Sequence, residues 1–165
     1  MDIINNRRSV RKFLDKQVEQ EKVEQLLRAA MQAPTAKNVQ PWRFLVIQNN
    51  ETLQKLGQMS KIIAGCRLVI ILMIDKELFP EPNLYAMDMG AATQNILLKG
   101  VQLDLGAVWI GLDGRLERIK GYLDILKVPE KYQLFSLLAI GYPEDEKANH
   151  YLDRFDQNKV FYEGF

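Results

Sequence analysis

The chain has 165 residues, of which 47% are hydrophobic and 26% charged, and its formal net charge is +1. This length and composition predict a single globular domain over residues 1–165. The nearly balanced charge excludes a global attraction to nucleic acid or to an anionic membrane, so any anion site must be local.

A single cysteine, Cys66, excludes an internal disulfide and fits a reducing compartment. The N-terminus has no apolar segment typical of a signal peptide, and the longest apolar run, residues 68–74, is too short to span a bilayer. We therefore expect a cytoplasmic protein with neither a nucleic acid nor a membrane as its partner.

The chain is predicted to begin with a helical turn at residues 2–6, followed by the basic segment RRSVRKF at residues 7–13. Arginine offers two-point hydrogen bonding to a phosphate, and the serine adds a hydroxyl group. If the segment is extended, one side presents Arg7, Ser9 and Arg11 while Val10 and Phe13 anchor it. The alternative is an ordinary solvated basic surface.

The next elements alternate between helix and strand. Residues 19–33 are predicted as an amphipathic helix with Val23, Leu26, Leu27 and Ala30 on its inner face. The polar loop at residues 34–42 could bind a flat heterocycle or form a plain turn. A strand at 43–48, one or two short helices within 51–63, and a fully buried strand at 67–75 follow.

Residues 83–103 are predicted as the central helix, after Pro82. Asp88 is its only charge before Leu98, and its apolar residues point in too many directions to form one stripe. Such a helix would be about 30 Å long, roughly the diameter of the domain. We therefore predict that its outer side meets a second subunit, with close approach at residues 90–92; the alternative is a core helix in a monomer.

The remaining part contains two more strands and a helix. A strand is predicted at residues 105–114, where Gly111 would permit a bound ring to approach the backbone. The helix at 115–126 would bury Leu116, Ile119, Leu123 and Leu126, and the last strand would span residues 134–140. The tail at 144–165 ends in aromatic residues, and we expect it to dock on another surface.

Other chemistries have too few residues of the required types. The single histidine, His150, is expected on the surface, which makes a zinc site or a catalytic triad improbable. Cys66 is expected to be a buried, unreactive thiol. Trp42 and Trp109 are expected in the core. No metal ligand and no catalytic side chain is assigned.

Six motifs in order carry a resemblance over nearly the whole chain: RRSVRKF at residues 7–13, APTAKNVQPWRF at 33–44, AATQNILL at 91–98, LGAVWIG at 105–111, IGYP at 140–143, and Arg154. Together they resemble the FMN-dependent nitroreductase family. The resemblance implies an α+β fold, with a mostly antiparallel sheet flanked by helices. It also implies an interlocked homodimer with FMN at the subunit interface and an exchanged C-terminal tail, whose residues 160–162 would add a strand to the partner's sheet.

The resemblance also implies a set of cofactor-binding residues. The FMN phosphate and ribityl chain would be held by Arg7, Arg8, Ser9, Arg11 and Arg154. The isoalloxazine would be met from the other subunit by Pro34, Thr35, Ala36 and Asn38. Ile110 and Gly111 would present backbone groups near the flavin N5, and Gln58 and Lys61 would contact the pyrimidine edge.

The sequence departs from the family pattern in two places. Asp104 replaces a glycine, which is tolerable because aspartate can adopt a left-handed conformation. The chain also lacks a helical insertion that often covers the active site in larger members, so we expect an open substrate pocket.

The function implied is an FMN-dependent oxidoreductase. It would use NAD(P)H to reduce a small aromatic electron acceptor, such as a nitroaromatic or a quinone, by a ping-pong mechanism. An alternative is a non-enzymatic FMN-binding dimer that stores flavin or senses redox state. A weaker one is an interaction protein that has lost its flavin.

Overall fold

The computed structural model describes residues 2–78, 85–112 and 116–164. A four-stranded sheet forms the middle layer, with the strand order β1-β2-β4-β3 and antiparallel pairing throughout. The strands are β1 (Trp42–Ile47), β2 (Leu68–Asp75), β3 (Gly106–Gly111) and β4 (Tyr132–Gly141). The prediction of an α+β fold with a mostly antiparallel sheet is confirmed.

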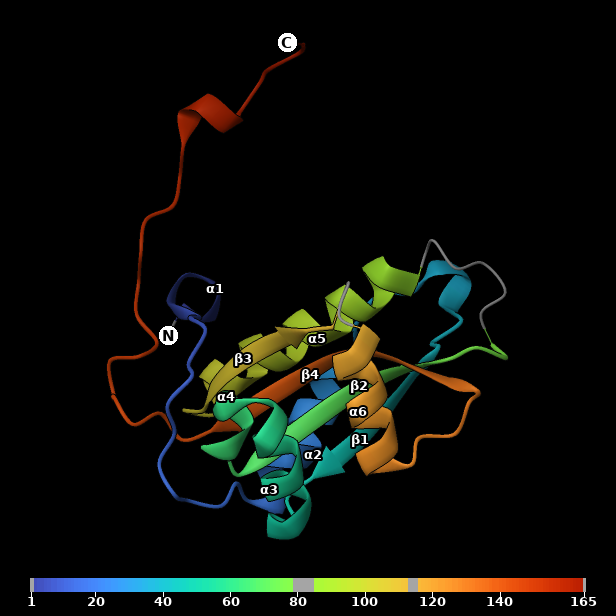
Figure 1. Cartoon of the computed structure of the whole chain (residues 1–165). Coiled ribbons are helices and arrows are strands. Elements are labelled where there is room, and N and C mark those ends of the chain that lie inside the picture. The colour runs from blue at the N-terminus through green and yellow to red at the C-terminus, as the bar shows by residue number, and fades with distance from the viewer. Residues whose placement is uncertain (1, 79–84, 113–115, 165) are drawn as a thin grey trace.

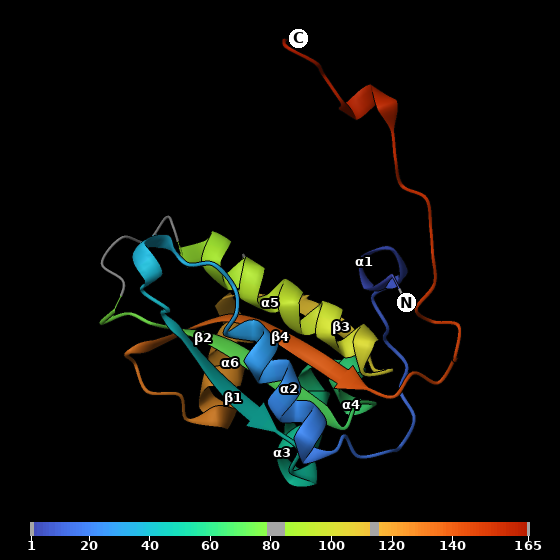
Figure 2. The ribbon, with the colours of Figure 1, turned by 180° about the vertical axis from the view of Figure 1, so that it is seen from behind.

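Helices cover both faces of this sheet (Figure 1, and Figure 2 from behind). One face carries α2 (Gln20–Ala30) and α5 (Tyr85–Gln102), and the other carries α3 (Asn50–Met59), α4 (Lys61–Ala64) and α6 (Leu116–Leu126). The short helices are α1 (Ile3–Asn6), η1 (Ala36–Asn38) and η2 (Gln157–Lys159). None of the helices in the described parts of the chain is long and apolar enough to cross a bilayer.

Strand β2 shows why the sheet can be covered on both sides. All eight of its residues are buried, and it pairs with β1 on one edge and β4 on the other. Alternate side chains of a strand point to opposite faces. Leu68, Ile70, Leu72 and Ile74 therefore pack with α2 and α5, while Val69, Ile71 and Met73 pack with the helices on the other face. The predicted buried strand is confirmed.

The central helix α5 packs against α2, α1 and the sheet, but part of its surface stays open. Residues 83 and 84 of the predicted helix lie outside the described residues. Ala92 faces the core instead of the outer side, whereas Met87 is 66% exposed. A Cβ on Gly90 would lie 3.8 Å from the Trp109 ring, so this glycine faces β3. The expected second subunit remains a prediction.

Helix α6 buries most of the predicted face, but Leu116 is wrongly included and Tyr122 is missing from the prediction. Leu116 is 79% exposed, whereas Tyr122 is fully buried and Ile119, Leu123 and Leu126 are partly buried. The helix approaches α3 around Gly121, where an added Cβ would meet the Met59 side chain. Leu116 lies more than one turn before that contact, and residues 113–115 lie outside the described residues.

The turn between α5 and β3 confirms the expectation for Asp104. Its φ is 60°, in the left-handed region, where the family pattern has a glycine. Short polar side chains tolerate this conformation best among non-glycine residues. The turn returns the chain antiparallel to α5 and starts the edge strand β3.

The N-terminal segment lies along the end of the sheet. Ser9 forms a parallel bridge with Ala107, and Phe13 an antiparallel bridge with Pro143. Val10 is buried against Gly106, where a Cβ would come within 2.6 Å of its Cγ1 atom. The two predicted anchors, Val10 and Phe13, are therefore confirmed.

The C-terminal tail leaves the body and runs past α1 into open space (Figures 1 and 2). Five large apolar side chains on it are exposed: Tyr151, Leu152, Phe155, Phe161 and Tyr162. Residues 160–162 are not in a strand of this chain. The expected docking surface is thus not supplied by the described part of the same chain.

Candidate functional site

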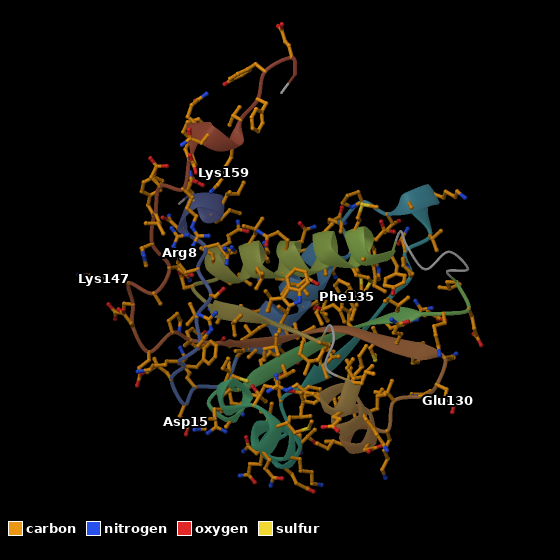
Figure 3. The ribbon with its side chains drawn as sticks, turned by 45° about the horizontal axis from the view of Figure 1, so that its top comes forward. Arg8, Asp15, Glu130, Phe135, Lys147 and Lys159 are labelled. Carbon is orange, nitrogen blue, oxygen red and sulfur yellow. The ribbon has the colours of Figure 1, made fainter. Side chains whose placement is uncertain are left out.

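A basic cavity lies where α1, the N-terminal segment and the start of the tail meet. It has a volume of about 250 Å³, and Arg7, Arg8 and Arg154 line it together with Tyr151 and Phe155. Figure 3 shows Arg8 between α1 and the tail. The backbone N–H of Arg8 donates to the Asn149 side chain at 3.3 Å, which ties the tail to this segment. Residues from near the two ends of the sequence therefore line the same cavity.

The charges in this cavity are not balanced. The Nη1 of Arg8 donates to the Arg7 carbonyl at 2.7 Å, but its Nε and Nη2 are buried and have no hydrogen-bond partner among the residues that the structure describes. Burial lowers the pKa of the Arg7 guanidinium, and the nearby charges of Arg154 and Arg8 lower it further. Asp153 also lines the cavity, and one of its oxygen atoms accepts the Phe155 backbone N–H. Because buried unpaired donors are costly, a bound anion would stabilise this cluster.

A second cavity, of about 360 Å³, opens along β3. Its lining includes Arg11, Ser60, Arg118 and the β3 residues Trp109, Ile110 and Gly111. Because β3 is the last strand of the sheet, its outer edge is not paired within the named strands. A Cβ built on Gly111 would meet nothing within 4 Å, so a planar ligand has room to approach the backbone there.

The N-terminal segment connects the two cavities. Arg7 and Arg8 line the first, and Arg11 lines the second. An extended chain rises about 3.3 Å per residue, so four residues span at most roughly 13 Å. An elongated ligand with an anion at one end could therefore contact both cavities from a single chain.

The loop at residues 34–38 lies elsewhere. The Ala36 N–H donates to Asp88 in the first turn of α5, whereas Ile3 of α1 lies beside Leu98 and Gln102 near the other end of that helix. Ten helical residues span about 15 Å, and both views show η1 and α1 at opposite ends of α5. Within one chain, Pro34, Thr35, Ala36 and Asn38 are therefore not brought to the basic cavity.

The sequence interpretation missed two polar lining residues of the second cavity, Ser60 and Arg118. Gln58 and Lys61 are exposed and do not line it, whereas the buried Ser60 between them does. Its position between two helices, where serine often caps a helix start, was the available signal. The sequence contained no such signal for Arg118, because only the packing of α6 on α3 brings its Nη2 to the Met59 carbonyl, at 2.9 Å. Both tryptophans were predicted in the core. Trp42 is buried, which confirms the prediction for it, whereas Trp109 is 38% exposed and the prediction for it is wrong.

His150 and Cys66 lie as expected. His150 is exposed, and its Nδ1 contacts the Lys147 carbonyl at 3.0 Å. Burial raises the pKa of the Cys66 thiol to about 11, so this thiol is not an activated nucleophile. Among the described residues, no group of three or more His, Cys, Asp or Glu side chains could hold a metal ion.

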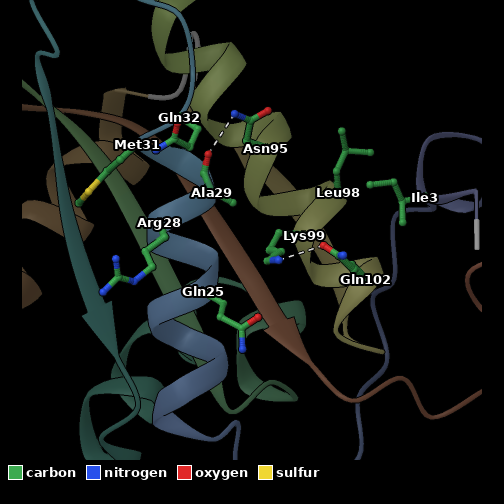
Figure 4. Close-up of a pocket in the computed structure, with 10 residues that line it drawn as sticks. All are labelled: Ile3, Gln25, Arg28, Ala29, Met31, Gln32, Asn95, Leu98, Lys99 and Gln102. Carbon is green, nitrogen blue, oxygen red and sulfur yellow. Dashed lines mark hydrogen bonds between the residues drawn. The ribbon is translucent and has the colours of Figure 1, made fainter.

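A groove of about 650 Å³ lies between α1, α2 and α5 (Figure 4). Its lining mixes apolar side chains, such as Ile3, Met31 and Leu98, with amide and basic groups. The Asn95 amide donates to the Ala29 carbonyl at 3.0 Å and joins α5 to α2 at its wall. This groove belongs to the open side of the central helix.

Comparisons with known proteins identify the family. A family model described as the nitroreductase family matches residues 4–64. A protein of Archaeoglobus fulgidus, provisionally named an NADH dehydrogenase/NAD(P)H nitroreductase, is 36% identical over 165 residues, which cover 97% of this chain and 95% of that protein. The chain belongs to the nitroreductase family.

Solved structures of nitroreductase-family proteins and relatives have the same fold. A crystal structure from Clostridium acetobutylicum, provisionally named an NADH oxidase, superimposes with a TM-score of 0.94 at 42% identity and covers 99% of this chain and 100% of its own. A Clostridium difficile structure named an FMN-dependent nitroreductase has a TM-score of 0.89 at 32% identity, covering 99% and 98%. This nitroreductase-family chain is therefore an oxidoreductase by family.

The geometry fits a flavin mononucleotide. The unpaired Arg8 nitrogen atoms and the neighbouring Arg7 and Arg154 suit a phosphate, which prefers charge-assisted hydrogen bonds from guanidinium groups. The open backbone edge at Gly111 suits a planar ring. The two cavities of this nitroreductase-family chain thus match the two ends of such a cofactor in charge and shape.

Proposed function

We propose that this chain is an FMN-dependent NAD(P)H oxidoreductase that works as a homodimer with one FMN in each interface. The observation that carries the proposal is the Arg8 guanidinium beside Arg7 and Arg154, two of whose nitrogen atoms are buried with no hydrogen-bond partner in the described part of the chain. Such a cluster needs an anion, and the FMN phosphate supplies one. The name of the Clostridium difficile relative supports the choice of this cofactor.

Each part of the chain has a role in holding the cofactor. Arg7, Arg8 and Arg154 bind the phosphate end, and Ile110 and Gly111 face the isoalloxazine. Ser9 and Arg11, which lie between these two ends on the N-terminal segment, hold the phosphate and ribityl chain. Pro34, Thr35, Ala36 and Asn38 meet the ring of the other subunit's FMN. Gln58 and Lys61, which are exposed beside the second cavity's Ser60, contact the pyrimidine edge.

The arrangement of these residues supports a dimer. The basic cavity and the loop at residues 34–38 lie near opposite ends of α5, and a second copy would bring the loop of one chain to the cofactor held by the other. The tail carries exposed aromatic side chains away from its own body, which suits an exchange between subunits. Residues 160–162 would then pair with an edge of the partner's sheet.

When bound, FMN supplies the hydride and electron transfer. The residues of the chain bind and orient it, and the partly exposed Trp109 forms one wall of the cavity at the ring. NAD(P)H and the acceptor use the same cavity in turn, which gives ping-pong kinetics. The acceptor is a nitroaromatic, a quinone or a similar electron-poor ring, and solvent supplies the protons.

The phosphate assignment is tested with Arg154→Ala. Loss of a charge-assisted hydrogen bond costs about 1.5–3 kcal/mol, so FMN affinity should fall roughly 10- to 150-fold. Riboflavin, which lacks the phosphate, should bind the variant and the wild type equally. Lys159→Ala is the matched control, because this tail cation pairs with Asp156 at 3.3 Å outside the cavity. Equal FMN affinity of Arg154→Ala and wild type would reject the assignment.

Catalysis and assembly are tested on the wild type. Yellow protein that oxidises NADH or NADPH only when a quinone or nitroaromatic is added supports the enzyme, whereas flavin without turnover supports storage or sensing. Deletion of residues 151–165 should convert the dimer to a single-chain species in analytical ultracentrifugation. A truncated chain that remains dimeric would reject the tail exchange.

A further inference from the structure

The loop at residues 35–40 is held in an unfavourable backbone conformation. Lys37, Asn38 and Gln40 all have positive φ values, of 53°, 55° and 52°. Non-glycine residues rarely adopt this region, and three within four positions require contacts that impose it. Strain of this kind persists where the surrounding structure over-determines it, and it often occurs at functional sites.

Most of the loop's hydrogen bonds are internal. The Asn38 N–H donates to the Thr35 carbonyl at 3.1 Å, and the Gln40 N–H donates to the Thr35 hydroxyl at 3.3 Å. The Gln40 amide also donates to the Asn38 side chain at 2.8 Å. Such bonds shape the loop but do not place it relative to the helices.

Asp88 places the loop. Its carboxylate on α5 accepts the Ala36 N–H at 3.0 Å, and the residue is only 7% exposed. This N–H opens η1, which has no side-chain cap from its own Thr35. Asp88 therefore caps η1 from another element, 52 positions along the chain.

The position of Asp88 in α5 explains why a carboxylate can be buried there. It lies in the first turn of the helix, where the free N–H groups and the macrodipole favour a negative charge. The same carboxylate thus faces the start of a long helix and the start of a short one. The oxygen atom that holds Ala36 is fixed by the most buried helix of the fold.

We propose that Asp88 is a positioning residue for the cofactor. From α5 it holds residues 35–40 in the left-handed conformation in which Thr35, Ala36 and Asn38 meet the flavin of the other subunit. This inference rests on the proposed function, because it assigns that loop to a cofactor. Asp88 itself is buried and takes no part in the chemistry.

Two substitutions separate this role from general stability. Asp88→Leu keeps the number and branching of the side-chain heavy atoms but removes the acceptor, and Asp88→Asn keeps an acceptor oxygen. We expect Asp88→Leu to lower kcat/KM roughly tenfold or more and to change the visible absorption spectrum of bound FMN. Asp88→Asn should restore both to near the wild-type values. An Asp88→Leu enzyme with a wild-type flavin spectrum and kcat/KM would overturn the proposal.

Thr93→Val is the matched control on the same helix. It removes a buried hydroxyl that donates to the Met89 carbonyl at 2.7 Å and contacts Ser136 at 3.2 Å, toward the sheet. We expect a lower melting temperature with an unchanged flavin spectrum. A spectral change equal to that of Asp88→Leu would show that any buried defect in α5 disturbs the flavin, which would also overturn the proposal.

Hydrogen exchange on the wild type keeps the test decisive if Asp88→Leu does not fold. The Ala36 amide should exchange slowly and at the same rate with and without FMN, since its acceptor is on α5. Fast exchange at Ala36 would overturn the proposal. Protein that binds no FMN would reject the proposed function instead, and slow exchange at Ala36 would then still establish the Asp88 contact.

Discussion

Strand β2 and the C-terminal tail are both rich in large apolar residues, yet they lie in opposite environments. Every residue of β2 is buried between two helical layers and two neighbouring strands. On the tail, Phe155 is 73% exposed and four other large apolar side chains are also exposed. The difference teaches that an apolar pattern predicts a need for burial but does not say which chain supplies the cover.

The largest effect that would sharpen this comparison is expected from Ile71→Ala in β2. The side chain is fully buried, so its truncation should lower the free energy of unfolding by about 2–5 kcal/mol in urea titrations. Phe155→Ala should instead raise the dimer dissociation constant in analytical ultracentrifugation. The expectation would be wrong if Phe155→Ala lowered the free energy of unfolding as much as Ile71→Ala does, at concentrations where the wild type is a single chain.

A second, smaller effect is expected where the N-terminal segment meets the body. A Cβ on Gly106 would lie 2.6 Å from Cγ1 and 2.7 Å from Cβ of Val10, so Gly106→Ala should cost about 1–3 kcal/mol of unfolding free energy. The displaced segment should also bind FMN more weakly. Adding Val10→Ala should recover part of the loss.

Gly111→Ala is the control for that steric argument. A Cβ there meets nothing within 4 Å, so the free energy of unfolding should change by less than about 0.5 kcal/mol. Equal destabilisation by the two glycine substitutions would show that backbone entropy, and not the Val10 contact, dominates.

A third effect, of about 1 kcal/mol at pH 9.5, is expected from Cys66. Burial raises the pKa of its thiol from 9.0 to about 11. As the pH rises, the thiol therefore ionises in the unfolded chain before it ionises in the folded protein. The contribution of the thiol to the free energy of unfolding is complete below pH 9 and is lost as the pH rises towards 11. Urea unfolding at pH 7.5 and 9.5 measures the difference in unfolding free energy between the two pH values. Cys66→Ala should make this difference smaller. An unchanged difference would exclude the thiol as its source.

The smallest effect is expected at the exposed start of α6. Leu116→Ala should change the free energy of unfolding by less than about 0.5 kcal/mol, because the side chain is mostly in solvent. Ile119→Ala, one turn further and partly buried, should cost more. A larger loss from Leu116→Ala than from Ile119→Ala in thermal unfolding would show that Leu116 is buried, as predicted from the sequence.

The elements were predictable because each has a clear local pattern. The apolar run of β2 and the proline and glycine boundaries of the helices placed the described elements within a few residues of the predicted ones. In α6, periodicity correctly indicated Ile119, Leu123 and Leu126, but it added the exposed Leu116 and missed the buried Tyr122. The helix turns Tyr122 inward where Gly121 packs against Met59 of α3. Local periodicity contains no information about that neighbour.

The site was predictable in part. The basic segment at residues 7–13 is visible as a cluster, but only the fold brings Arg154 to Arg7 and Arg8. The resemblance to the family predicted that Arg154 acts with Arg7 and Arg8, whereas the distance between them in the sequence gave no indication of it. Asp88 and Arg118 were missed as site-supporting residues because each acts through a tertiary contact, with Ala36 and with Met59. A single charge inside an apolar helix was the available signal for Asp88.

The strand order also constrains how the protein is made. β2 lies between β1 and β4, and β4 is translated only after α5, β3 and α6. Until then the nascent chain exposes one unpaired edge of its most apolar strand, which is the kind of surface that chaperones recognise and that aggregates in crowded cells. Completing the sheet is therefore a late event in synthesis, and slow translation of the segment before β4 would prolong the vulnerable stage.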